Sequence, residues 1–139
     1  MPYQVDVPIS ISYNGNSTNY LFYSKHRGTP TDEISVWVVD FDTELSCFDI
    51  CYKKGWHNGA YGWGLISAGV NQLLRLGENL RNDQLIIAKF VTDQNQWHGY
   101  PADLRHKPAD KPLPNILLKW FSERLISKAI MSRIKQGQI

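Results

Sequence analysis

The first forty residues mix β-branched and aromatic side chains with turn formers, a pattern typical of strands joined by short loops. Segments 5–13 and 20–23 are β-prone. Between them Asn14-Gly15 predicts a hairpin turn, because both residues tolerate a positive φ angle. The run 34–41 (ISVWVVDF) gives the strongest strand prediction in the chain.

The middle of the chain is less regular. Segment 45–52 has apolar residues at both helical and alternating spacing, and its aromatic content favours a fourth strand. The glycines within 55–64 indicate a loop. Apolar positions within 65–76 recur at helical spacing, which predicts a central helix that ends near Gly77. The run 84–91 (QLIIAKFV) predicts another strand.

The last third changes character. Segment 92–114 is polar and proline-rich, so we expect a long connection there. Apolar stripes then predict helices over 115–125 and 127–136, the second capped by Ser127. Because strands come first and helices later, residues 1–139 are expected to form one α+β domain. We expect an antiparallel sheet of four or five strands, a central helix and a C-terminal helix pair.

The net charge of +2 averages two unlike parts of the chain. Residues 1–110 carry nine basic and twelve acidic side chains, a net −3, whereas residues 111–139 carry six basic and one acidic, a net +5. This excludes a uniformly basic nucleic-acid coat. A solvent-facing helix would explain the basic tail, and so would an acidic partner. Nucleic acid would be contacted through Lys128, Arg133 and Lys135.

Composition narrows the class of protein further. Hydrophobic residues make up 42% of the chain and charged residues 20%, so a disordered chain is not expected. Neither a run of about 18 apolar residues nor a signal-peptide pattern is present, so we expect a cytoplasmic protein without membrane contact. Cys47 and Cys51 are too few for a disulfide framework or a zinc site, and we expect both to be small buried residues.

Two short segments each combine an indole, an imidazole, a glycine and a phenol: 56–61 (WHNGAY) and 97–101 (WHGYP). Flat rings with polar tips, together with glycines that allow close approach, are typical of binding walls, although such residues also cover the ends of sheets. From these segments and the loop that follows the second, we take as candidate binding residues Trp56, Asn58, Tyr61, Trp97, Tyr100, Asp103 and Arg105.

His57 and His98 are the candidate catalytic residues. Two imidazoles that face one cleft can act as base and acid without a metal ion. No recognised metal-ligand spacing is present, and the phosphate-binding loop, the dinucleotide fingerprint and the nucleophile elbow are all missing. We therefore expect neither a metal nor a cofactor.

The segment WHGYPAD at 97–103, and scattered positions after it, resemble a pattern in small bacterial proteins of uncharacterised activity, some of which are carried on mobile gene cassettes. The later positions are Pro112, Leu117, Trp120, Leu125, Ile126, Ser127, Lys128, Met131 and 134–138. The resemblance covers only the last third of the chain. It implies an accessory, cytoplasmic bacterial protein and transfers no catalytic residue.

The leading hypothesis is a small binding or interaction module whose two aromatic–histidine segments recognise an unidentified small molecule or protein. A metal-independent nuclease or hydrolase that uses the histidine pair is the first alternative. A nucleic-acid binder that uses the basic C-terminal helices is the second. A homodimer, formed through a strand edge or through the stripe of Trp120 and Phe121, is compatible with each of them.

Overall fold

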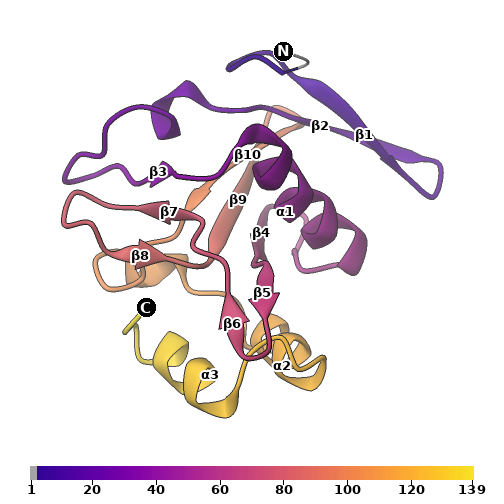
Figure 1. The fold of residues 1–139 in the computed structure, drawn as a ribbon. Coiled ribbons are helices and arrows are strands. Elements are labelled where there is room, and N and C mark those ends of the chain that lie inside the picture. Colours follow the sequence, from indigo (N-terminus) through magenta and orange to yellow (C-terminus); the bar gives the residue numbers. More distant parts are fainter. Residues whose placement is uncertain (1–2) are drawn as a thin grey trace.

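The fold is built around a mixed sheet of five strands, shown in Figure 1, in a computed structural model that describes residues 3–139. Three neighbouring pairs are antiparallel, whereas β2 and β10 run parallel. The predicted α+β class is confirmed, but the sheet is not purely antiparallel, because a long excursion of the chain separates β2 from β10. In spatial order the strands are β1 (Ile9–Tyr13), β2 (Asn16–Tyr20), β10 (Gln96–Pro101), β9 (Ala88–Asp93) and β4 (Tyr61–Gly64).

The hairpin predicted at Asn14-Gly15 is confirmed. Both residues have positive φ angles, 49° and 78°, and they join β1 to β2. Smaller sheets complete the strand inventory: β3 (Val36–Trp37), β7 (Gly77–Glu78) and β8 (Gln84–Leu85) form one, and β5 (Ser67–Gly69) and β6 (Gln72–Leu73) form the other. The strand predicted over 34–41 is therefore shorter than expected.

Helix α1 (Phe41–Lys54) replaces the strand predicted over 45–52, which was wrong. Its beginning explains the helix. The Asp40 carboxylate accepts a hydrogen bond from the Thr43 backbone N–H at 2.8 Å, and Gly55 ends the helix in a left-handed conformation at φ 71°. The helical spacing of the apolar residues was the better signal in this segment.

The central helix predicted over 65–76 was also wrong. The segment forms the β5–β6 hairpin, and Val70, taken as part of an apolar stripe, is 90% exposed near its turn. Asn71 has a φ angle of 57°, which interrupts any helix. The single helix in the middle of the fold is thus α1, which lies earlier in the chain than predicted.

The C-terminal helix pair is confirmed as α2 (Pro114–Ser122) and α3 (Lys128–Lys135). The Ser127 hydroxyl accepts a hydrogen bond from the Ile130 N–H at 3.1 Å, as an N-cap should. The connection expected over 92–114 instead contains β10 and the short 3₁₀ helix η2 (Pro108–Asp110). Trp120 is fully buried, so it cannot contribute to a surface stripe for a second copy.

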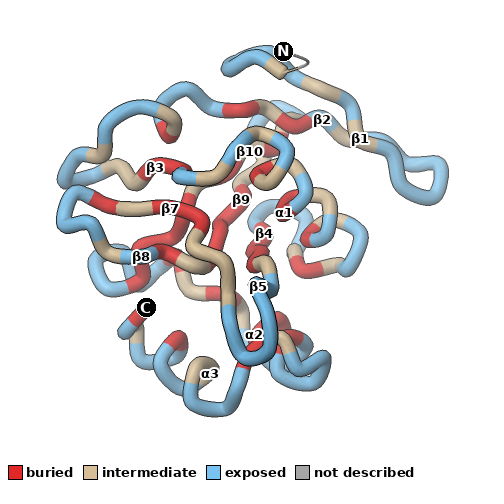
Figure 2. Tube along the Cα trace, viewed as in Figure 1, coloured by how far each residue is buried: buried red, intermediate tan, exposed pale blue. Residues whose placement is uncertain are grey.

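One part of the core lies between α1 and the sheet, where Figure 2 shows the buried segments of β4, β9 and β10, and α2 and α3 contribute further buried residues. Cys47 and Cys51 face β4 from successive turns of α1, and both are buried free thiols, as expected. A Cβ atom at Gly64 or Gly62 would lie only 2.8 Å from the sulfur of Cys47 or Cys51 respectively. Small residues on both elements therefore set the close approach of helix and sheet.

Strand β10 presents different chemistry on its two faces, because successive side chains of a strand point in opposite directions. On the face toward α1, here called the packing face, Trp97 contacts Phe48 with ring centroids 5.6 Å apart. On the opposite face, here called the polar face, lie His98 and Tyr100, which contact the segment around the 3₁₀ helix η1 (Ser24–His26). Within residues 3–139 no helix is long and apolar enough to cross a membrane.

Candidate functional site

A polar cavity of about 210 Å³ lies on the polar face of β10, and we call it the histidine cavity. It is enclosed by β10, by the segment that follows η1 and by the loop after β10. Its lining residues are Tyr23, Lys25, His26, Thr31, Asp32, Glu33, Ile34, Ser35, Asn79, His98, Tyr100, Pro101, Asp103, Lys107 and Asp110.

A buried ion pair fixes the η1 segment over the sheet. The Arg27 guanidinium donates to the carboxylate of Glu44 on α1 at 2.6 Å, and it also donates to the backbone carbonyl of Val39. Glu44 is fully buried and accepts a second hydrogen bond from the Tyr20 hydroxyl at 2.5 Å. Burial raises the pKa of Glu44, opposed by these two partners. The pair holds the neighbouring residue, His26, at the wall of the cavity.

Four aromatic rings form a continuous wall of the cavity. The centroid of Tyr23 lies 4.7 Å from that of His98 and 6.0 Å from that of His26. His26 in turn stacks on Tyr100 with centroids 5.0 Å apart. Two rings therefore come from one strand and two from a segment more than 70 positions earlier, which folding brings together.

Both histidines of this wall are neutral at pH 7. Burial lowers the pKa of His26 to about 4, and burial also lowers the pKa of His98. The Nδ1 atom of His26 lies 2.8 Å from the carbonyl oxygen of Ser35. Because a carbonyl can only accept, Nδ1 carries the proton and Nε2 is left as an acceptor. The Nδ1 atom of His98 is buried and makes no hydrogen bond within residues 3–139.

A buried charge pair closes one side of the cavity. Lys89 on β9 donates to Asp110 at 2.8 Å, and the Tyr100 hydroxyl donates to the same carboxylate at 3.0 Å. Burial raises the pKa of Tyr100, and the adjacent Asp110 carboxylate raises it further. Tyr100 therefore remains a phenol at neutral pH and keeps its proton for this hydrogen bond.

Asp103 is a second buried carboxylate with partners of its own. It accepts hydrogen bonds from Asn79 at 2.9 Å and from His106 at 2.8 Å. Burial favours the neutral acid, but the hydrogen bonds from Asn79 and His106 outweigh it and lower the pKa of Asp103. The two buried carboxylates that line the cavity, Asp103 and Asp110, thus have hydrogen-bond donors within the protein.

The two histidines predicted as a catalytic pair lie on opposite faces of the sheet. His98 lines the histidine cavity, whereas the ring of His57 lies 5.7 Å from Trp97 and 5.4 Å from Tyr52. His57, Trp97 and Tyr52 line a separate, open cavity of about 440 Å³. The geometry does not support proton exchange between His57 and His98.

The predicted binding residues divide between several environments. Tyr100 and Asp103 join His98 in the histidine cavity, whereas Trp56 and Trp97 are buried in the core. Gly99 does not make room for a ligand, since a Cβ atom there would lie 2.3 Å from the Phe90 ring.

The remaining predicted residues lie outside the histidine cavity. The Asn58 carboxamide accepts hydrogen bonds from the N–H groups of Ala60 and Tyr61, which stabilises its own turn. The Tyr61 ring is partly exposed and lies under the ammonium of Lys89, 4.7 Å from the ring centroid. Arg105 lines a different pocket, described below.

The sequence-based interpretation missed His26, Ser35 and Lys107. The sequence assigned no functional role to segment 26–30, and no spacing in the sequence connects it with 97–103. Lys107 donates to the backbone carbonyl of Glu33 and so ties the loop after β10 to the η1 segment. The only signal for His26 in the sequence is that it is one of just four histidines, each of which could be considered as a candidate.

Among residues 3–139, no three His, Cys, Asp or Glu side chains are grouped so that they could hold a metal ion. Lys128, Arg133 and Lys135 of α3 are exposed, and Lys135 also uses its backbone carbonyl to accept from Lys111 at 2.8 Å. Comparison with known proteins gives no match to any family model, curated protein or solved structure.

Proposed function

We propose that the protein is a binding module that takes a small, planar, uncharged polar molecule into the histidine cavity. The volume of about 210 Å³ is below the range typical of drug-sized ligands and suits a molecule of about one ring. The wall of aromatic rings favours a flat ligand, because aromatic groups pack against one another.

The observation that carries the proposal is the buried Nδ1 atom of His98. Buried polar atoms are nearly always paired, and leaving one unpaired costs about 1–3 kcal/mol. This nitrogen makes no hydrogen bond within the described chain, and its ring lines the cavity beside Tyr23. Because this nitrogen faces away from solvent, a ligand would recover that cost once the His98 ring turns Nδ1 toward the cavity.

The charge around the cavity favours an uncharged ligand. Asp103 and Asp110 have partners of their own, which leaves Lys25 and Lys107 to balance two rim carboxylates, those of Asp32 and Glu33. Because His26 and His98 are neutral, neither positive nor negative charge dominates around the cavity. A ligand with a full charge would gain little to offset its lost hydration.

Nicotinamide is a suitable probe because it is flat, uncharged and carries both a hydrogen-bond donor and acceptors. We expect saturable binding by isothermal calorimetry, and binding to weaken about tenfold in His98→Gln. Cyclohexanecarboxamide has the same polar group without the flat ring and should bind more weakly. His57→Gln is the matched control and should bind as the parent does. Equal affinity in the two variants, or no saturation in the parent, would contradict the proposal.

A second candidate function rests on His26 and His98 lining one cavity, as His57 and His98 do not. His26 presents an unprotonated Nε2 at neutral pH beside the neutral His98, and it could act as a weak general base in metal-independent hydrolysis. Hydrolysis of bis(4-nitrophenyl) phosphate in the presence of a chelator tests this candidate. The rate should fall about 100-fold in His26→Gln. A rate no higher than that of buffer would eliminate the candidate and leave the binding function unaffected.

A further inference from the structure

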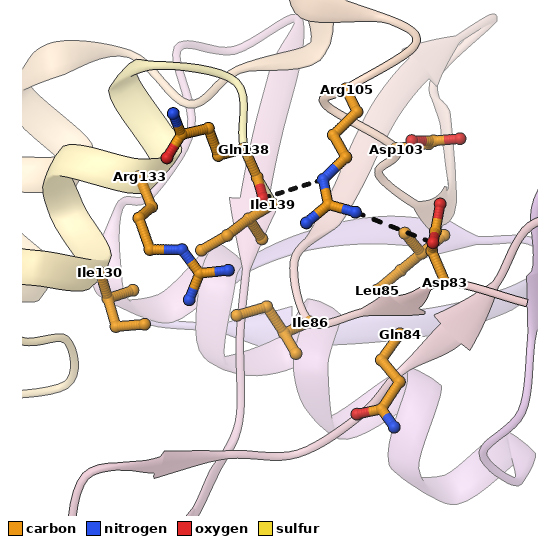
Figure 3. Close-up of a pocket in the computed structure, with 10 residues that line it drawn as sticks. All are labelled: Asp83, Gln84, Leu85, Ile86, Asp103, Arg105, Ile130, Arg133, Gln138 and Ile139. Atoms are coloured by element: carbon orange, nitrogen blue, oxygen red, sulfur yellow. Dashed lines mark hydrogen bonds and ion pairs between the residues drawn. The ribbon is translucent and has the colours of Figure 1, made fainter.

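A second pocket, of about 300 Å³, lies beside the C-terminal helix α3 and contains two arginines (Figure 3). We call it the arginine pocket. It shares only Asp103 with the histidine cavity. Its lining residues are Asp83, Gln84, Leu85, Ile86, Asp103, Arg105, Ile130, Arg133, Gln138 and Ile139.

The two guanidinium groups differ in the hydrogen-bond and ion-pair partners that they have within the protein. Arg105 donates through Nε to the carbonyl oxygen of Gln138 at 3.0 Å, and its Nη1 lies 3.8 Å from the Asp83 carboxylate. The Arg133 guanidinium makes neither a hydrogen bond nor an ion pair within residues 3–139, although the Arg133 backbone carbonyl accepts from the Gln138 N–H at 2.9 Å. Figure 3 shows both guanidinium groups extending toward the middle of the pocket, beside Ile86 and Ile139.

The acidic groups of the pocket are already engaged. Asp83 accepts a hydrogen bond from Asn79 at 2.9 Å in addition to its contact with Arg105. Asp103 is held by His106 and Asn79. The exposed guanidinium of Arg133 therefore has no acidic partner at the pocket wall.

Apart from the side-chain amides of Gln84 and Gln138, the other lining residues of the pocket are apolar. Leu85 and Ile139 are buried, and Ile86 and Ile130 are half-buried. Ile130 and Arg133 are three positions apart on α3, so they lie on the same helical face and present an apolar and a charged group side by side. A ligand that suits both must combine an anionic end with an apolar body.

We propose that the arginine pocket binds a small organic carboxylate with a short apolar chain. Its carboxylate would pair with the guanidinium of Arg133, whose fork of donors matches two carboxylate oxygens. Its chain would lie against Ile86 and Ile130. The proposal is independent of the function proposed for the histidine cavity.

Hexanoate is the probe, followed through the methyl NMR signals of Ile86 and Ile130 in the full chain. We expect both signals to shift and saturate, and the affinity to fall about tenfold or more in Arg133→Gln. Arg133→Lys keeps the charge but loses the fork and should show an intermediate loss. Lys128→Gln, a change of an exposed basic residue on the same helix, should leave the affinity unchanged.

Two further probes divide the contributions of the charge and the chain. Hexanamide lacks the charge and inorganic phosphate lacks the chain, so both should bind more weakly than hexanoate. Four results would overturn the proposal: no saturation with hexanoate, equal binding of hexanamide, equal or tighter binding of phosphate, or an equal loss in Lys128→Gln. Circular dichroism of each variant checks that the helix is retained.

Discussion

The packing face and the polar face of β10 are made by adjacent residues of one short segment, yet they have different roles. On the packing face, Trp97 and Gly99 fit against the aromatic core under α1. On the polar face, His98 and Tyr100 join His26 in a cavity. The indole and the imidazole that look like one motif in the sequence are thus separated by the sheet. Which of these residues line the cavity is decided by the alternation of side chains along the strand, and not by the composition of the segment.

The largest expected effect comes from breaking the buried charge pair on the polar face. Lys89→Met leaves Asp110 buried without its cation, and we expect a loss of about 3–5 kcal/mol in the free energy of unfolding. Urea denaturation measures it. Lys53→Met is the control, because its ion pair with Asp49 is exposed and contributes less than about 0.5 kcal/mol. Similar losses in the two variants would show that burial of the pair is unimportant.

The next effect breaks the packing face. In Gly99→Ala the new methyl group would lie 2.3 Å from the Phe90 ring, which is fully buried. We expect a loss of about 3 kcal/mol, the upper part of the range for overpacked cores. Gly28→Ala is the matched control, since nothing lies within 4 Å of its Cβ position. If the two substitutions are equally tolerated in thermal unfolding, the packing assigned to Gly99 is wrong.

Acid should lower the stability of the protein through His26 on the polar face. In the unfolded chain His26 binds a proton below about pH 6.5, whereas in the folded protein its pKa of about 4 delays protonation. Between these values the unfolded state binds more protons, so stability falls as the pH falls from 6.5 toward 4. We expect a loss of about 3 kcal/mol from this residue. The acid limb of stability against pH should flatten in His26→Gln, and an unchanged limb would refute the assignment.

The smallest expected effect on stability is that of replacing His57 or His98, and the two variants are distinguished by ligand binding. His57 and His98 are both partly exposed, so substitution of either by Gln should cost less than about 1 kcal/mol. Denaturation midpoints of the two variants should therefore be similar, while only His98→Gln weakens nicotinamide binding. A large destabilisation in His98→Gln would assign this residue a structural role instead.

The parts of the fold set by local interactions could be predicted from the sequence. The Asn14-Gly15 turn needs only positive φ angles, and the helix cap at Ser127 needs only a hydroxyl and the N–H three positions later. The segment 45–52 failed because its aromatic residues suit a strand and a helix equally. The segment forms helix α1 because Asp40, which lies outside it, caps the helix, and because the two cysteines pack against β4.

The candidate site was only partly predictable, because it depends on contacts between distant segments. His98, Tyr100 and Asp103 were named from one local segment. His26 reaches the cavity through an ion pair between Arg27 and Glu44, which are 17 positions apart and share no pattern in the sequence. Treating 97–101 as a loop hid the alternation that sends Trp97 and His98 to opposite faces.

The most direct test follows the imidazole NMR signals of all four histidines while nicotinamide is added to the full chain. The signals of His26 and His98 should shift with the same dependence on nicotinamide concentration and reach saturation together, because both rings line the same cavity. The His57 signal should stay in place, since its ring lies on the packing face. Saturable shifts of His57 in place of His26 and His98, or no saturable shift at any histidine, would contradict the assignment of the polar face as the functional side.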